Sequence, residues 1–274
     1  MSVFTIDRDK CNSCGMCFEE CPAAVIAMRK GEALPSLAEG GESRCVNCVH
    51  CVVVCPTGAL YHRTMKPEEC APISKKLLPS AVQIEHLMKS RRSIRAYKEK
   101  PVEREKLAKL IDIARYAPSG HNMRPVHWLV IEDREEVKRL GGLVADGMRS
   151  MLQVVPSLAD TFHLDVLVSA WDSGIDMLMH GAPHLIVAHA HPVGATPQAD
   201  CDIALTYMEL AAYSMGLGAC WNGYFQVTST AYPPIMEALQ LPEGHQCYGA
   251  MLIGYPKYKY SLIPVRPEPP IVWR

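Results

Sequence analysis

Apolar residues recur at helical spacing in several segments of the last two hundred residues. A helix is predicted to begin after Ser80, whose hydroxyl can cap it, because the apolar residues that follow fall near one face. Further helices are predicted over residues 102–116, 135–143 and 200–215, and Gly216 ends the last of them. On the 102–116 segment the charged residues point outward, which is typical of a solvated helix face.

Three other segments carry the β-branched and apolar composition of strands. They span residues 126–132, 184–190 and 248–254. Strands separated by helices predict an α/β or α+β core. Residues 142–179 fit neither pattern cleanly, so we expect mixed helix and loop there.

The N-terminal segment is organised around cysteines rather than around apolar periodicity. The pattern C-x2-C-x2-C-x3-C followed by proline occurs twice, and every cysteine of the second run follows its counterpart at the same interval. Eight thiolates with this spacing suit two [4Fe-4S] clusters. The predicted metal ligands are Cys11, Cys14, Cys17, Cys21, Cys45, Cys48, Cys51 and Cys55.

Two other uses of these cysteines fit less well. A disulfide framework needs an oxidising compartment, and the N-terminus has no apolar signal-peptide core. Structural zinc uses cysteine pairs separated by a long loop rather than triplets at i, i+3 and i+6.

The cysteine runs resemble the bacterial two-cluster ferredoxins, with a longer loop at residues 22–44. In such runs the fourth cysteine ligates the other cluster. The resemblance implies one cluster on Cys11, Cys14, Cys17 and Cys55, and another on Cys45, Cys48, Cys51 and Cys21.

Length and charge limit the remaining classes of protein. A chain of 274 residues predicts two domains, which we place at 1–64 and 80–274 with a proline-containing linker at 65–79. The net charge of −1 makes nucleic acid and anionic membrane surfaces unexpected partners. No apolar run reaches the roughly 18 residues of a membrane span. The cysteine usage predicts a reducing, cytoplasmic location.

The larger segment contains three short motifs that stand out from the helix and strand patterns. Arginines and a serine crowd into residues 91–95, and guanidinium groups bind phosphates and planar carbonyls well. A turn at 117–122 and a glycine-rich turn at 216–223 follow in the chain. By itself the arginine cluster is as consistent with a basic helix end.

Taken in order, these motifs resemble the nitroreductase family of FMN-dependent enzymes over residues 80–274. The family's glutamine and tryptophan after the first turn are replaced here by Arg124 and Val126. The resemblance implies an α+β fold with a central mixed sheet. It also implies these cofactor-binding residues: Arg91, Arg92, Ser93, Arg95, Pro118, Ser119, Asn122, Leu217, Gly218, Asn222, Gly223 and Arg266.

The resemblance further implies a homodimer with FMN at the subunit interface, in which the arginines neutralise the phosphate and the reduced ring. No catalytic side chain is predicted, because the flavin carries the chemistry. No Rossmann or P-loop motif is present. His189 and His191 are predicted to be structural rather than metal ligands. Met177, Met179 and Trp171 are read as core residues, with a lid as the alternative.

We therefore expect an oxidoreductase in which an external donor reduces the clusters and FMN then reduces a small nitroaromatic, quinone or enone. The donor is expected to be a ferredoxin-like protein, with NAD(P)H as the alternative. A different class of function is an electron-relay subunit of a larger complex without its own substrate. Flavin destruction and dehalogenation rank below both.

Overall fold

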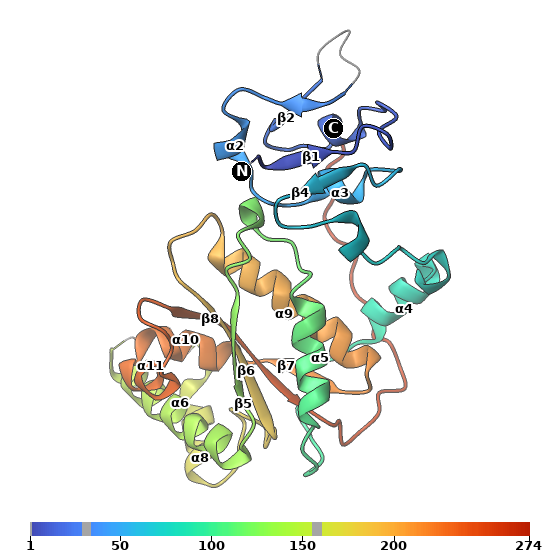
Figure 1. The fold of residues 1–274 in the computed structure, drawn as a ribbon. Helices are drawn as coiled ribbons and strands as arrows, with labels where there is room; N and C mark the ends of the chain where they lie inside the picture. The colour runs from blue at the N-terminus through green and yellow to red at the C-terminus, as the bar shows by residue number, and fades with distance from the viewer. Residues whose placement is uncertain (1, 29–33, 155–160) are drawn as a thin grey trace. The chain divides into compact units, whose positions relative to one another are not determined.

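The computed structural model describes residues 2–28, 34–154 and 161–274. The chain divides into two compact units (Figure 1). Unit 1 contains Met1–Leu78 together with His121–Met123, and unit 2 contains Pro79–Gly120 and Arg124–Arg274.

Unit 1 is built from short elements that repeat along the chain. Two antiparallel pairs join β1 to β4 and β2 to β3, and helices α1 and α3 occupy corresponding positions in the two cysteine runs. The segment expected to be a linker forms two 3-10 turns, η1 and η2. The elements are β1 (Phe4–Ile6), α1 (Met16–Glu19), β2 (Ile26–Ala27), β3 (Ser36–Leu37), α2 (Gly41–Arg44), α3 (His50–Val53), β4 (Leu60–His62), η1 (Pro67–Glu69) and η2 (Lys75–Leu77).

The apolar core of unit 1 is small and is completed by thiols. Cysteines from both runs pack against the buried apolar side chains. A core of this size leaves a domain marginally stable unless another interaction supports it. The buried apolar members are Val3, Phe4, Val25, Ile26, Val52 and Leu60.

Unit 2 has a four-stranded sheet in the order β5-β6-β8-β7. Every strand pair described in it is antiparallel, where a mixed sheet was expected. The expected α+β class is confirmed. The elements are α4 (Ala81–Ser90), α5 (Arg104–Ala114), β5 (His127–Ile131), α6 (Arg134–Val154), α8 (Leu164–Asp172), β6 (His184–Ala190), α9 (Pro197–Ser214), β7 (Gly218–Trp221), α10 (Gly223–Ala231), α11 (Pro233–Leu239) and β8 (Gln246–Gly254).

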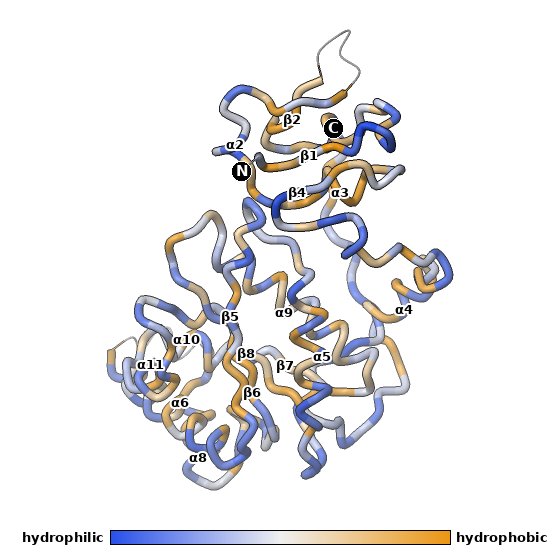
Figure 2. The backbone as a smooth tube through the Cα atoms, viewed as in Figure 1, coloured by the Kyte–Doolittle hydropathy of each residue, from blue (hydrophilic) through white to orange (hydrophobic). Residues whose placement is uncertain are grey.

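Both faces of the sheet are covered by helices. On β6, Leu185 and Val187 join the apolar cluster formed with α6, α8, α10 and α11. Ile186 and Ala188, which point the other way, join the cluster formed with α5 and α9. Burial on both faces explains why β6 is apolar at nearly every position, as the orange tube shows (Figure 2).

Most predicted elements are present with shifted ends. Ser80 caps α4 as expected, by accepting a hydrogen bond from the Gln83 amide at 3.3 Å. Helix α6 runs well beyond the predicted 135–143, because its apolar stripe continues into the region expected to be mixed. Helices α10 and α11 were not predicted, since the glycine-rich turn was expected to lead only into an extended segment.

Helix α6 has 21 residues, a length that could cross a bilayer. Its first turns are strongly charged, and its buried residues lie on one face. Across the three described ranges, no helix is both long enough and apolar enough to span a membrane.

Two glycines of α6 give opposite expectations for stability. A β-carbon on Gly147 would lie 2.3 Å from Thr228 Cγ2 and 3.0 Å from Tyr232 Cβ, which lie on helix α10 and at its C-terminal end. We expect Gly147→Ala to lower the free energy of unfolding by about 2 kcal/mol. A β-carbon on Gly142 would meet only Trp171 Cζ2, at 3.8 Å. Gly142→Ala should therefore raise it by up to about 1 kcal/mol.

Urea unfolding followed by tryptophan fluorescence measures both variants in unit 2, because all four tryptophans lie there. Equal effects of the two substitutions would show that helix propensity, not the contact between α6 and α10, controls the response.

Candidate cofactor sites

The two cysteine loops share an unusual backbone. Ser13 and Gly15 have positive φ angles of 58° and 79°, and Asn47 and Val49, at the corresponding positions of the second loop, have 50° and 56°. A β-branched residue such as Val49 is strained in this conformation. The left-handed residues curl each loop so that its first three cysteines face a common cavity.

Each cavity takes its fourth cysteine from the other run. One is lined by Cys11, Cys14, Cys17 and Cys55, and the other by Cys21, Cys45, Cys48 and Cys51. Four thiols around one space, three of them from one short loop, are the donor set of a cubane cluster. All twelve cysteines lie within the described residues and none forms a disulfide. The residues present therefore fit two [4Fe-4S] clusters.

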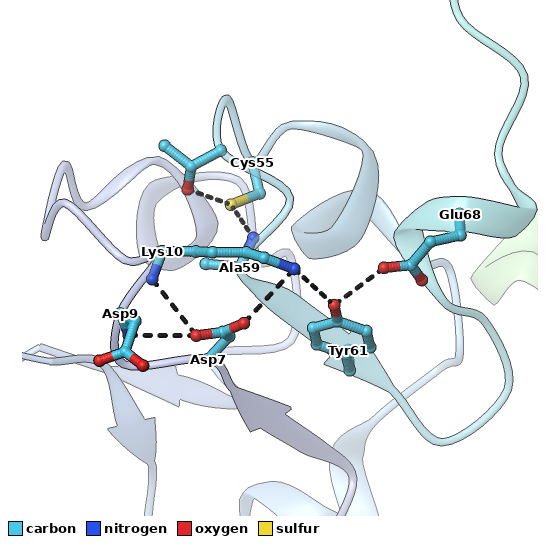
Figure 3. A network of polar contacts seen from close by, with 8 residues as sticks. Asp7, Asp9, Lys10, Cys55, Ala59, Tyr61 and Glu68 are labelled. Atoms are coloured by element: carbon cyan, nitrogen blue, oxygen red, sulfur yellow. Dashed lines mark hydrogen bonds and ion pairs between the residues drawn. The ribbon is translucent and has the colours of Figure 1, made fainter.

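Backbone amides add donors to the exchanged cysteines in both halves. The Val25 amide donates to Cys21 Sγ and the Ala59 amide donates to Cys55 Sγ, each at 3.2 Å. Figure 3 shows the second of these contacts, with a hydroxyl also directed at Cys55 Sγ. That hydroxyl belongs to Thr57 and lies 3.6 Å away. Such donors stabilise a thiolate more than a thiol.

A polar chain holds the start of the first cysteine loop (Figure 3). Lys10 Nζ donates to the Tyr61 hydroxyl at 3.0 Å and pairs with Asp7 at 3.4 Å. The Tyr61 hydroxyl in turn donates to Glu68 at 2.9 Å. Because Tyr61 lies on β4, this chain fixes the loop entering Cys11 against the strand that follows the second run.

A cavity of unit 2 suits a flat organic cofactor. Its volume is about 400 Å3, within the usual range for small-molecule sites. Its lining is largely apolar with one guanidinium group, that of Arg95. The other lining residues are Met148, Met151, Phe162, Leu164, Leu178, His180, Cys220, Trp221, Asn222, Gly223, Tyr224, Val227, Thr228 and Leu252.

The first arginine of the predicted cluster is already paired within the subunit. Arg91 Nη1 lies 2.8 Å from Glu209 Oε1, and the Glu209 carboxylate is largely buried. The same carboxylate accepts a hydrogen bond from Trp221 Nε1 at 3.3 Å. Arg91 therefore joins the arginine segment at residues 91–95 to α9 and to the end of β7.

The segment carrying the arginines lies directly against β7. Ile94 donates a backbone hydrogen bond to Ala219 O at 2.9 Å. A β-carbon on Gly218 would lie 2.7–2.9 Å from the Ile94 side chain, so only glycine allows this approach. Gly218 thus positions Arg95 at the cavity.

Asn222 lines the cavity but its side chain is occupied by structure. Its Oδ1 caps α10 by accepting from the Phe225 amide at 3.0 Å. Its Nδ2 donates to Leu178 O at 3.0 Å. Asn222 therefore joins the start of α10 to the segment before β6.

The predicted turn at residues 118–122 is held by hydrogen bonds within the protein. Ser119 Oγ accepts from the Arg124 amide at 2.9 Å, and the Gly120 amide donates to Asp200 at 2.9 Å. Asn122 belongs to unit 1, where its Nδ2 donates to the carbonyls of Val46 and Asn47 at 3.1 Å each. These contacts occupy two of the side chains that the sequence assigned to the flavin.

The other predicted ligands fall into three environments. Arg92 and Ser93 are half-buried, Pro118 and Arg266 are exposed, and Leu217 is buried in the core. Gly223 lines the cavity at the start of α10. Arg266 lies in residues 257–274, which form no helix and no named strand. The structure therefore brings Arg95, Asn222 and Gly223 together at one cavity and does not bring Arg266 to it.

Several cavity residues were missed from the sequence. His180 has a positive φ of 54°, and burial lowers its pKa. Met148 comes from α6 and Cys220 from β7. His180 and Met148 lie outside every motif that the sequence offered, whereas Cys220 lies inside the glycine-rich turn at 216–223 but was expected to be a buried apolar residue. Met179 belongs to the core and Trp171 packs against it, as expected, whereas Met177, also expected in the core, is 41% exposed.

The pair His189 and His191 is joined in space by His127 and His245. The Nδ1 atoms of His189 and His245 lie 2.9 Å apart, and the rings of His127 and His245 are 4.8 Å apart at their centroids. Within the described ranges, no three histidines, cysteines or carboxylates are arranged to hold a single metal ion. Burial and the neighbouring His245 and His127 lower the pKa of His189 to about 4.

Family models match both parts of the chain. Residues 88–255 match the model described as the nitroreductase family, and residues 10–60 match the model of the 4Fe-4S dicluster domain. The chain therefore belongs to the nitroreductase family and carries a 4Fe-4S dicluster domain ahead of the family domain. It is an oxidoreductase of the flavin-dependent nitroreductase type.

Individual relatives support the same division. A Methanothermobacter thermautotrophicus protein named for NADH dehydrogenase and NAD(P)H nitroreductase is 27% identical over 177 residues, which cover 65% of this chain and 79% of that protein. A ferredoxin from Methanocaldococcus jannaschii is 36% identical over 64 residues, or 23% of this chain and 82% of the ferredoxin.

Solved structures agree on the fold of unit 2. A nitroreductase with bound FMN from Bacteroides fragilis has a TM-score of 0.56 at 23% identity, covering 70% of this chain and 99% of that one. A second, from Desulfitobacterium hafniense, also with bound FMN, has a TM-score of 0.55 at 23% identity and covers 67% and 93%.

The histidine cluster predicts a pH-dependent stability of unit 2. The folded pKa of His189 is depressed below its usual 6.5, so the unfolded chain binds the proton more readily. Stability is then complete above pH 6.5 and is lost as the pH falls toward 4. The free energy of unfolding should drop by about 2 kcal/mol between pH 7.5 and pH 5 through this residue.

Urea unfolding monitored by tryptophan fluorescence at both pH values measures the drop. In His189→Phe the difference between the two pH values should shrink by the same amount. An unchanged difference in that variant would assign the pH dependence to other groups.

Proposed function

We propose that this protein takes single electrons from an external low-potential protein, passes them to FMN and reduces a small organic electrophile. The acceptor class is a nitroaromatic, quinone or enone. When bound, the clusters exchange one electron each and FMN couples these to two-electron chemistry. The observation that carries the proposal is the presence, in one chain, of two four-cysteine cavities and a largely apolar cavity with Arg95 in its lining, the last within a nitroreductase domain.

Arg95 is the residue we assign to the negative charge of FMN. Arg91 is neutralised by Glu209, whereas Arg95 lines the cavity and is exposed there. A guanidinium stabilises both a phosphate and an anionic reduced ring. Arg92, Ser93, Pro118 and Ser119 remain proposed ligands, while Gly218 and Asn222 act by positioning.

The walls of the cavity favour a small apolar acceptor. Met148, Met151, Phe162 and Val227 surround the space beside Arg95. Apolar walls exclude water from the reacting face and accept flat molecules of several kinds. We assign no side chain as a required acid.

The expected donor is a one-electron protein. Two clusters per chain hold the two electrons that one FMN needs, which is a physical reason to join these domains. NAD(P)H, which appears in the names of relatives, is the alternative donor. The reducing conditions of the cytoplasm would keep the cysteines available for iron.

A homodimer would cover apolar surface that one subunit leaves exposed. Helix α4 buries none of its residues, and Val82 and Met88 on it are 73% and 54% exposed. The C-terminal stretch exposes Leu262 and Trp273, at 82% and 86%. Apolar surface of this extent is typical of protein interfaces. We propose that a second copy of the chain covers both segments.

Removing one cluster ligand should separate electron entry from flavin binding. In Cys14→Ala, turnover driven by a reduced ferredoxin should fall by about two orders of magnitude, because the first cluster loses a thiolate. FMN content should stay at the wild-type level, since Cys14 lies in unit 1. Anaerobic steady-state rates, iron analysis and flavin absorbance measure the three quantities.

Cys70→Ala is the matched control, because Cys70 lies in the same unit and lines neither cysteine cavity. It should keep wild-type iron content and rate. Undiminished ferredoxin-driven turnover in Cys14→Ala would overturn the cluster route. A cluster-loaded, flavin-loaded protein that reduces no acceptor of the three classes would instead favour a relay subunit.

Arg95→Gln should weaken FMN binding by about ten- to hundredfold, because a charge-assisted hydrogen bond is lost. Fluorescence titration of the flavin-depleted protein with FMN measures the dissociation constant. Arg139→Gln, which removes an exposed arginine paired with Glu136 on α6, should leave it unchanged. Equal affinity in Arg95→Gln and wild type would place the flavin elsewhere.

A further inference from the structure

A buried histidine contacts one cysteine of the second cavity. His62 is 5% exposed, and its Nε2 lies 3.5 Å from Cys45 Sγ. The backbone around it is well held: His62 pairs with Phe4 across β1 and β4, and its amide donates to Met65 O at 3.0 Å. The imidazole lines the same cavity as Cys45.

The hydrogen on Nε2 follows from the contacts of the other ring nitrogen. The Thr64 amide donates to His62 Nδ1 at 3.2 Å, and an amide nitrogen can only donate. Nδ1 is therefore an acceptor, so the neutral ring carries its hydrogen on Nε2, directed at the sulfur. The protonated ring also carries a hydrogen there, so the donor does not depend on titration.

The internal repeat shows that this donor is present in one half only. The backbone donors match, since Val25 and Ala59 occupy corresponding positions of the repeat and contact corresponding cysteines. The side-chain donors do not match: the residue of the first half that corresponds to His62 is Met28, which has no side-chain N–H group. Thr57, near Cys55 of the first cavity, corresponds to Ala23.

The two side-chain donors differ in strength. The Thr57 hydroxyl lies 3.6 Å from an exposed part of Cys55, whereas the His62 imidazole is buried. A donor in a low-dielectric environment stabilises negative charge more than an exposed one. A reduced cluster carries one more negative charge than an oxidised one, so a hydrogen bond to its thiolate raises the reduction potential.

We propose that His62 holds the reduction potential of the cluster on Cys21, Cys45, Cys48 and Cys51 above that of its neighbour. His62 is then a positioning residue for charge, acting through Cys45. This cluster is then reduced first, and the cluster on Cys11, Cys14, Cys17 and Cys55 is reduced second. The inference rests on the two clusters of the proposed function.

Exchanging the matched residues tests the proposal. In His62→Met, the ratio of reduced to oxidised high-potential cluster at a fixed solution potential should fall about tenfold, equivalent to about 59 mV for one electron. In Met28→His, the reduction potential of the low-potential cluster should rise. In His62→Gln, which keeps an N–H donor, the high-potential cluster should keep most of its wild-type potential. Redox titration of the full-length holoprotein with electron paramagnetic resonance measures both couples.

Thr57→Val is the internal control, because its hydroxyl contacts a ligand of the other cluster. It should leave the high-potential couple unchanged. Unchanged potentials in a fully loaded His62→Met, or equal shifts of both couples, would overturn the role of His62. Low iron content in the wild type would instead overturn the proposed function, so the two failures are distinguishable. If His62→Met loses its clusters, Met28→His still tests the proposal. A Met28→His protein that holds both clusters but shows no rise in the lower reduction potential would then overturn it.

Discussion

The exchange of one cysteine between two loops is the constraint on which the N-terminal unit depends. Cys21 reaches the cavity of the second run and Cys55 reaches that of the first, so neither half holds a complete ligand set. The apolar core beside them is too small to stabilise a domain of this length alone. Binding of the two clusters would therefore stabilise the folded form of this unit.

In unit 2, close packing positions the arginine segment at residues 91–95. The absence of a side chain at Gly218 lets Ile94 lie against β7, and this contact directs Arg95 to the cavity. Glu209 neutralises Arg91 and also holds Trp221, so one buried carboxylate joins the arginine segment to the strand. Gly218 and Arg91 thus act by positioning, and Arg95 presents its charge to the cavity that we propose for FMN.

Local patterns predicted the elements whose identity depends on neighbours in sequence. The cysteine spacing, the cap at Ser80 and the apolar run of β6 were each readable over a few residues. Helices α10 and α11 were not predicted, because the glycine-rich turn was expected to continue into an extended segment. In the structure Asn222 caps α10 at that point. The antiparallel pairing of the strands was not predicted either. The direction of each strand depends on where the connecting helices α6, α8 and α9 bring the chain back to the sheet.

The sequence by itself determined the iron–sulfur chemistry, because eight cysteines at fixed spacing suit two cubane clusters. The arginine cluster pointed to a flavin only in combination with the motifs that follow it. Tertiary structure alone decided which side chains are free to act. Arg91 and Glu209 are 118 residues apart in the chain, and no local pattern reports that they pair. The donor from His62 to Cys45 likewise depends on the pairing of β4 with β1, which turns the imidazole toward the cavity. Such contacts are non-local, so no pattern of neighbouring residues reports them.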